Sequence, residues 1–218
     1  MSSSENGSRA AQDGSKISGV VVGIVTDNQD RQGMARVKVR FPWRDDQDNS
    51  YWARIASLMG GKDRGTYFLP EVDDEVLVAF DHGDVHHPYI VGALWNGEDS
   101  PPETNSDGKN DIRKIKSRSG HEIIFNDDNE TGGEKLEIRT NAGHKILLDD
   151  SSGGEKIEIT DKSGSNAVAI DSVQNAISVK SGMKVSIESQ MIEIKAGGMM
   201  NIEASGTLTL KGAVVMIN

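Results

Sequence analysis

Apolar and polar residues alternate in short runs along most of this chain, without the 3.6-residue period of an amphipathic helix. In the first half, four runs have the pattern of strands, at residues 20–25, 35–41, 75–80 and 89–95. Turn-forming residues separate them, at positions 27–30, 60–63 and 82–84. Five or so short strands within about 80 residues are typical of a small closed barrel, with the OB-fold as the leading candidate.

The second half repeats itself. Residues 119–125 and 132–138 are nearly copied by residues 142–148 and 153–159. The glycine-histidine pairs of the two units are 23 residues apart, and their double glycines are 21 residues apart. A repeat in this range indicates a stacked array, in which each unit buries its apolar face only against its neighbours.

Beyond the two long units, the pattern shortens to one strand about every eight residues. A single-chain parallel β-helix needs about 20 residues per coil, because it has three faces to line. Each step here supplies about one face, and free strand edges would recruit other chains. The period therefore predicts an intertwined homotrimer, a triple-stranded β-helix or β-prism. Its predicted core residues are Ile170, Val179, Val185, Ile187, Ile192, Ile194, Ile202, Leu208 and Leu210.

These patterns divide the chain into four predicted segments. Residues 1–16 are polar and predict a flexible leader, and residues 17–97 predict the OB-fold domain. Residues 98–116 include two prolines, which lack the ladder donor, and predict a linker. Residues 117–218 predict the triple-stranded β-helix. Glycines 182, 197, 198, 206 and 212 fall between its strands, where we expect corners with φ values that other residues avoid.

Composition narrows the function. Hydrophobic residues make up 35% of the 218 residues and aromatic residues 5%, which is little for a self-contained core. The net charge of −10 argues against general binding of nucleic acid, because phosphate binding needs a concentrated basic face. The chain has no cysteine, so disulfides and thiolate metal sites are excluded.

The barrel region also carries a family resemblance. Residues 19–97 resemble the OB domain of VgrG and of phage baseplate assembly protein V, in blocks at residues 23–28, 36–43, 51–54, 65–72, 74–80, 82–84 and 92–97. The repeat region is similar to the triple-stranded β-helix of these spikes. The resemblance implies the trimeric, non-enzymatic central spike of a contractile injection machine. Sheath contraction would drive the shaft through the target envelope, with transient contact to the target membrane.

The resemblance also implies partners and departures. About 16 polar residues precede the barrel, so a separate hub or baseplate protein is expected at the OB domain. A PAAR-repeat protein is expected on the tip, docked on the apolar C-terminal residues Val214, Val215, Met216, Ile217 and Asn218. Asp73 stands where the family usually has glycine. The last histidine is His144, so the self-made His-x-His metal tip of some spikes is not expected, and neither is any other cofactor.

We expect synthesis in the cytoplasm and assembly into a virion or an extracellular contractile particle, because the N-terminal segment lacks the apolar stretch of a signal peptide. Two other functions stay open. A polysaccharide-degrading enzyme on a β-helix would need converging carboxylates; the candidates Glu188, Glu193 and Glu203 alternate onto the outer face of the predicted shaft.

A binder of single-stranded nucleic acid would use aromatic and basic side chains on the barrel. The candidates are Trp43, Tyr51, Trp52, Arg36, Lys38, Arg40, Arg44 and Arg54, for which packing is the competing interpretation. The histidines His82, His86 and His87 lie near Asp81 and Asp84, which also admits a metal site.

Overall fold

A computed structural model describes residues 16–43 and 49–217. The chain divides into two units, residues 1–108 and 109–218, each described here by itself. In the described residues every regular element is a strand, apart from the short 3₁₀ turn η1 (Asp81–Gly83). This confirms the predicted all-β class. The expected leader lies almost wholly outside the described residues.

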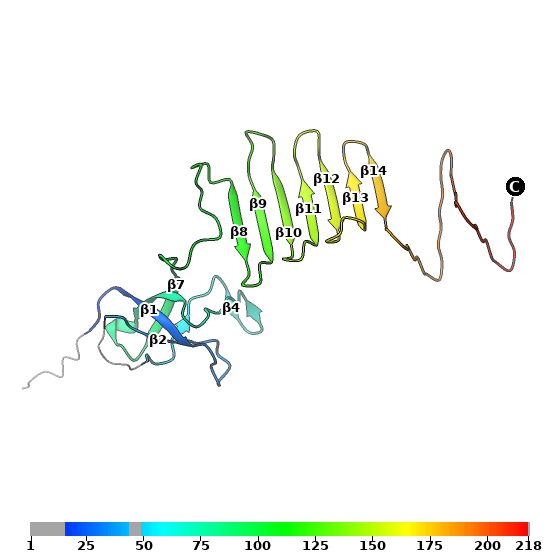
Figure 1. Cartoon of the computed structure of the whole chain (residues 1–218). Helices are drawn as coiled ribbons and strands as arrows, with labels where there is room; N and C mark the ends of the chain where they lie inside the picture. The colour runs from blue at the N-terminus through cyan, green and yellow to red at the C-terminus, as the bar shows by residue number, and fades with distance from the viewer. Residues whose placement is uncertain (1–15, 44–48, 218) are drawn as a thin grey trace, which may run out of the picture. The chain divides into compact units, whose positions relative to one another are not determined.

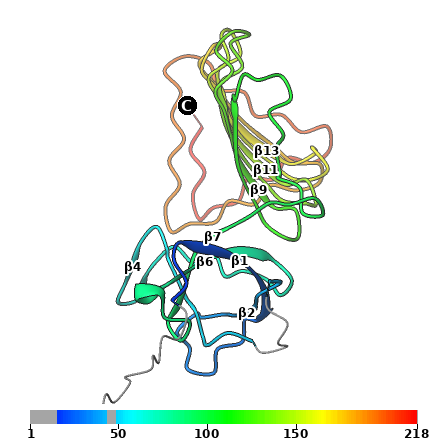
Figure 2. The ribbon, with the colours of Figure 1, turned by 90° about the vertical axis from the view of Figure 1, so that its left-hand side faces the viewer.

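The first unit is the predicted OB-type barrel. Its sheet has the order β2-β1-β6-β7-β3, and Figure 2 shows it curling around a core. The strands are β1 (Val20–Asp27), β2 (Lys38–Arg40), β3 (Arg54–Ile55), β6 (Glu75–Phe80) and β7 (Pro88–Ala93). Strand β3 runs parallel to β7, and a bridge between Val37 and Ala53 joins the two ends of the sheet. One parallel pair in an otherwise antiparallel ring closes the barrel.

Strict alternation fills the core of this barrel. In β6, every second side chain is buried, from Val76 through Val78 to Phe80. Successive strand residues point to opposite faces, so a period of two places a complete apolar set inside. The buried set is Val25, Val37, Val39, Phe41, Ala53, Val76, Val78, Phe80 and Ile90.

A small hairpin extends from the barrel. Strands β4 (Gly60–Gly61) and β5 (Arg64–Gly65) form a separate two-stranded sheet. A side chain at Gly65 would place its Cβ 2.5 Å from the Met59 carbonyl oxygen, at a φ of 151°. Only glycine fits there, so the close approach of the two strands depends on it.

The second unit is a seven-stranded antiparallel meander, drawn from green to yellow in Figure 1. Its strands are β8 (Ile112–Lys116), β9 (Glu122–Asn126), β10 (Lys135–Arg139), β11 (Lys145–Asp149), β12 (Lys156–Thr160), β13 (Ala167–Asp171) and β14 (Ala176–Lys180). Each strand pairs with the next in sequence over five residues. The two copied sequence units are therefore consecutive hairpins of one sheet.

The repeated histidines join successive turns along one edge of this sheet. The His121 Nδ1 atom accepts a hydrogen bond from the Asn141 backbone N–H at 3.3 Å. One repeat later, His144 Nδ1 accepts from the Lys162 N–H at 3.2 Å. Gly120 and Gly143, which precede the histidines, have φ values of 85° and 98°. In each pair, the glycine thus allows the turn, and the histidine accepts a hydrogen bond from the backbone of the following turn.

The structure corrects three expectations. Residues 112–116, placed in the linker, form β8; its Ile112 and Ile115 are three positions apart, so the strand lacks visible alternation. The ladder from Ile112 to Lys180 forms within one chain, which narrows the expected intertwined part to residues after 180. Positive φ values occur at ten described glycines, and none of the five predicted corner glycines is among them.

Residues 181–217 contain no strand, although their sequence alternates as strands do. They continue beyond β14 as extended runs separated by bends, including those at 182–183, 197–198 and 205–206. Figure 1 draws this segment after β14 in orange to red.

Candidate assembly surfaces

One face of the seven-stranded sheet is almost entirely apolar. Cross-strand register aligns its side chains in two rows, one residue from each strand in each row. The first row begins with Arg113 and continues with Phe125, Leu136, Leu148, Ile157, Ile170 and Ile177. The second row contains Ile115, Ile123, Ile138, Ile146, Ile159, Val168 and Val179. Seven strands at about 4.8 Å spacing make this face roughly 30 Å long.

These thirteen apolar side chains are not covered within the described chain. Ile146 is 40% exposed and Ile159 is 52% exposed, whereas Val78 in the barrel core is fully buried. Eleven of the thirteen exceed one-third exposure, and only Ile123 and Leu136 are half-buried. A bare apolar surface of this extent on a soluble protein marks an interaction site.

The opposite face of the same sheet is polar, and its charged side chains pair with one another. Glu122 is only 6% exposed, and its carboxylate accepts a hydrogen bond of 2.7 Å from Arg139 Nε. The ammonium groups of Lys116 and Lys114 lie 3.4 and 3.9 Å from the same carboxylate. The Arg139 guanidinium holds the pKa of Glu122 below its usual range, despite opposing desolvation. Leu147, on this face, is buried among the long polar side chains.

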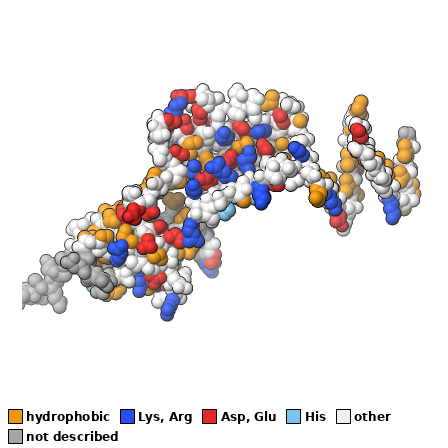
Figure 3. All heavy atoms as spheres, viewed as in Figure 1, with side chains coloured by type: hydrophobic (Ala, Val, Ile, Leu, Met, Phe, Trp, Pro, Cys, Tyr) orange, Lys and Arg blue, Asp and Glu red, His pale blue; other side chains and the backbone are white. Residues whose placement is uncertain are grey.

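Ion pairs continue along this polar face and leave it satisfied in a single chain. Arg139 also lies 3.3 Å from Glu137, and Lys156 lies 3.4 Å from Glu158. Figure 3 shows acidic and basic side chains intermingled over the strands of the sheet. The polar face is therefore satisfied within one chain, while the apolar face is left exposed.

Of the predicted core residues, the structure places Ile170 and Val179 on the apolar face, one in each row. Val179 and Val185 line one hollow of about 680 Å³ over the second row, together with Ile146 and Ile159. The others lie exposed in the strandless segment: Ile187, Ile192, Ile194, Ile202, Leu208 and Leu210. The apolar residues of β8 to β12 were missed, although their alternation in sequence was the available signal.

The predicted tip-docking residues are exposed at the end of the described chain. Val214 is 77% exposed and Ile217 is 86% exposed, with Val215 and Met216 between them. Asn218 lies outside the described residues. The candidate carboxylates Glu188, Glu193 and Glu203 are also exposed in this segment, and Glu193 lies 3.3 Å from Lys195 Nζ.

Basic and aromatic side chains gather on the outside of the barrel. Lys38 Nζ lies 5.0 Å from the ring centre of Trp52, and the Arg36 guanidinium lies 5.7 Å from it. The Arg54 guanidinium stacks 4.7 Å from the ring centre of Tyr89 and donates a 2.6 Å hydrogen bond to its hydroxyl. Because Val37 and Ala53 point inward as a bridged pair, their neighbours Lys38, Trp52 and Arg54 point outward. We call Lys38, Arg40, Trp52, Arg54 and Tyr89 the basic stripe.

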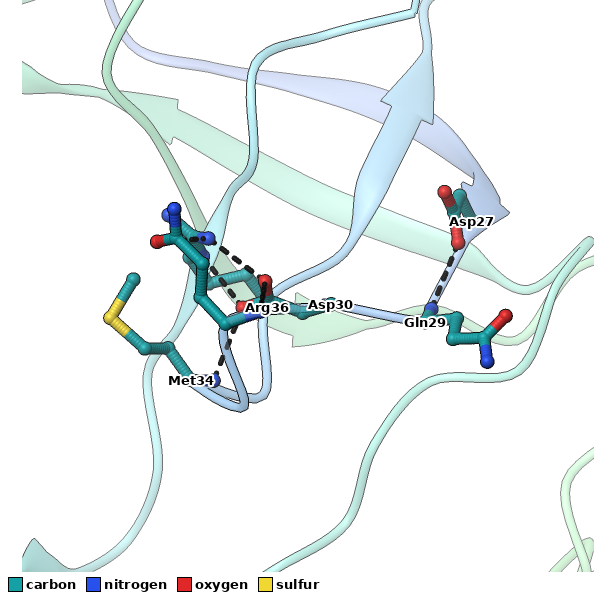
Figure 4. Close-up of polar contacts among 6 residues, drawn as sticks. Asp27, Gln29, Asp30, Met34 and Arg36 are labelled. Atoms are coloured by element: carbon teal, nitrogen blue, oxygen red, sulfur yellow. Dashed lines mark hydrogen bonds and ion pairs between the residues drawn. The ribbon is translucent and has the colours of Figure 1, made fainter.

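A buried ion pair fixes the loop beside this stripe, as Figure 4 shows. Asp30 accepts hydrogen bonds from Arg36 Nε at 2.8 Å and Nη2 at 2.9 Å. It also accepts from the backbone N–H groups of Gln32 and Met34. The Arg36 hydrogen bonds hold the pKa of Asp30 far below its usual range. Asp30 therefore has a structural role, in which it holds the loop between β1 and β2.

The histidine cluster of the barrel is organised by one carboxylate. Asp84 accepts from the His86 backbone N–H, which lowers the pKa of Asp84 to about 2 together with the His86 ring at 2.7 Å. His87 Nδ1 lies 3.1 Å from the other carboxylate oxygen. Among the described residues, no group of three His, Asp or Glu side chains has metal-binding geometry. Within the same residues, no helix is long and apolar enough to span a membrane.

Comparison with known proteins decides the family. Residues 21–95 match the model of the type VI secretion system/phage-baseplate injector OB domain, which covers the barrel. The barrel is therefore an OB domain of the VgrG and phage baseplate V family.

Members of this family share more than the barrel with the chain. The type VI secretion system spike protein VgrG1a of Pseudomonas aeruginosa is 30% identical over 142 residues, which are 61% of this chain and 22% of VgrG1a. VgrG3 of Vibrio cholerae is 28% identical over 122 residues, 52% of this chain and 12% of VgrG3. The actin cross-linking toxin VgrG1 of the same species is 26% identical, over 53% of this chain and 11% of its own length. The chain thus spans about a fifth or less of these relatives.

Proposed function

We propose that this chain is the structural central spike of a contractile injection machine, and that it works as a homotrimer. The observation that carries the proposal is the bare apolar face of the β8–β14 sheet, opposed by a self-satisfied polar face. Three such sheets, each with its apolar face inward, form a closed prism with a dry axis. Burying the exposed half of thirteen side chains would contribute on the order of 10 kcal/mol per chain.

The strandless segment supports the same assembly. Residues 181–217 alternate in sequence but have no ladder partner in one chain. Backbone N–H and C=O groups require partners when they are buried. Strands from two other copies would supply them, so we infer that the intrachain sheet passes into an interchain β-helix after Lys180. The predicted core residues from Val185 to Leu210 then point toward the axis.

Such an assembly suits a mechanical part. The backbone ladder and the apolar axis would run together along the whole shaft, and closure removes the free sheet edges that cause aggregation. The spike-protein names of the relatives support this role. We propose that the protein is non-enzymatic, because a convex prism offers no cleft in which Glu188, Glu193 and Glu203 could converge.

The two ends of the spike would carry its partners. The exposed residues Val214–Ile217 support docking of a PAAR-type tip protein. A separate hub or baseplate protein would hold the barrel, and the shaft would contact the target membrane only while it passes through. We therefore propose that the protein is assembled into a virion or an extracellular contractile particle.

Electron microscopy of the purified protein tests the trimeric spike. We expect a slender needle with threefold symmetry at one end of a wider body. A compact single-chain particle would contradict the proposal. For the tip, deletion of residues 214–218 should abolish co-purification with a PAAR-type partner, while the same deletion should leave the threefold needle intact.

A further inference from the structure

A groove of about 710 Å³ lies on the barrel unit, beside the basic stripe. Three segments line it: the β1–β2 loop at 33–35, strand β3, and the β4–β5 hairpin with the residues that follow it to Leu69. Arg54 belongs both to the groove and to the stripe. The two features therefore form one continuous surface, and it needs only the barrel unit.

The rim of the groove is apolar and uncovered. Met34 is 54% exposed, Met59 55%, Phe68 68% and Tyr67 73%. The rim is also held in place. The Asp30–Arg36 pair and its backbone bonds fix the loop that carries Met34 (Figure 4), and Ser57 Oγ donates to the Thr66 carbonyl at 2.8 Å across the hairpin. Apolar side chains exposed on a rigid frame are suited to anchor a partner's apolar residue.

The stripe supplies charge of one sign next to this groove. Arg36 is neutralised by Asp30. Among the described residues, no carboxylate lies within ion-pair distance of Lys38, Arg40 or Arg54. These three cations, which form no ion pair with a described residue, contrast with a chain whose net charge is −10. Such a local concentration complements an acidic partner.

We propose that the stripe and groove together bind an acidic protein segment that carries a large apolar residue. Carboxylates of the segment pair with Lys38, Arg40 and Arg54, and its apolar side chain enters the groove between Met34 and Phe68. The stacking geometry favours this ligand over nucleic acid. Bases bind by stacking on free aromatic faces, whereas Trp52 and Tyr89 already carry the chain's own cations.

Synthetic peptides test this surface on the full-length protein. The probe is fluorescent hexaglutamate, with and without two C-terminal leucines, and binding is followed by anisotropy across a salt series. We expect the dileucine peptide to bind more tightly than plain hexaglutamate, and both affinities to fall with salt. Arg54→Glu should weaken binding of both peptides about tenfold or more. Lys62→Glu makes the same charge change on the hairpin outside the groove and should have little effect.

A second pair of variants tests the apolar anchor. Phe68→Ser should reduce the dileucine peptide to the affinity of plain hexaglutamate, while Leu58→Ser, an exposed residue outside the groove, should not. Circular dichroism confirms that each variant is folded. The proposal is overturned if neither peptide binds, if Lys62→Glu weakens binding as much as Arg54→Glu, or if an oligothymidylate binds more tightly than the peptides.

Discussion

The barrel and the seven-stranded sheet are both built from strands with alternating apolar and polar residues, yet they bury their apolar residues to different degrees. In the barrel, the sheet closes on itself, and residues such as Val78 are fully buried. In the second unit, the sheet stays open, and residues such as Ile146 remain 40% exposed. Closure therefore decides which unit is complete in one chain. The barrel buries its own core, whereas the sheet leaves one apolar face exposed in a single chain.

The largest effect is expected from charged residues placed on the open apolar face of the sheet. Ile146 and Ile159 are direct cross-strand partners, so Ile146→Asp with Ile159→Asp would place two carboxylates in each wall of the proposed trimer. Burial of unpaired charge is prohibitive, and we expect complete loss of the trimer in sedimentation analysis. Thr160→Asp, on the polar face of the same strand, is the matched control and should leave the trimer intact.

In the barrel, truncation should cost stability and leave assembly unchanged. Val78→Ala removes two methyl groups from a fully buried site, which should cost about 2 kcal/mol of unfolding free energy. Urea denaturation followed by tryptophan fluorescence would measure it. If Val78→Ala dissociated the trimer as completely as the two aspartates do, assembly would depend on the barrel core as much as on the apolar face of the sheet. That result would contradict the comparison.

The polar face of the sheet should depend on pH. The pKa of Glu122 is lowered in the folded protein, so its contribution to stability is present above the carboxyl's ordinary pKa and is lost on acidification. Glu122→Gln should therefore cost about 1.5 kcal/mol at pH 7. The gap to the unchanged protein should close as the pH falls below about 4. A gap that stays constant from pH 7 to pH 3 would refute the charge-based origin.

The smallest expected effect lies in the turn before β6. Asp73 has a φ of 78°, and its N–H donates to the Val25 carbonyl at 2.9 Å. This left-handed conformation is strained for a residue with a Cβ and suits glycine. Asp73→Gly should raise the unfolding free energy by about 0.5 kcal/mol. Asp74→Gly, at the neighbouring position, should not stabilise the protein.

Sequence patterns were sufficient for the class of fold and for most strands. Alternation located β1, β6 and β7, and the copied glycine-histidine units located the hairpins of the sheet. It failed at β8, where Ile112 and Ile115 are three positions apart. It also failed at the two-residue strand β3, which is held by long-range pairing with β7, and at β4 and β5, which are too short to show a period.

The interaction surfaces were only partly predictable. Ile170 and Val179 were identified from their spacing, but the register that aligns them with Ile115 or Ile138 appears only when the ladder is formed. The basic stripe was noticed as residue types. Its geometry was not foreseeable, because Asp30 neutralises Arg36, whereas Arg54 has no ion pair with any described residue and instead stacks on Tyr89.

The mass of the native particle tests the central claim most directly. One chain has a mass of 23.5 kDa. Native mass spectrometry of the full-length protein should give a particle of three chains, and the two-aspartate variant of the apolar face should give single chains. A monomeric mass for the unchanged protein at micromolar concentration would contradict the account, because its apolar face would then be stable in water without other copies.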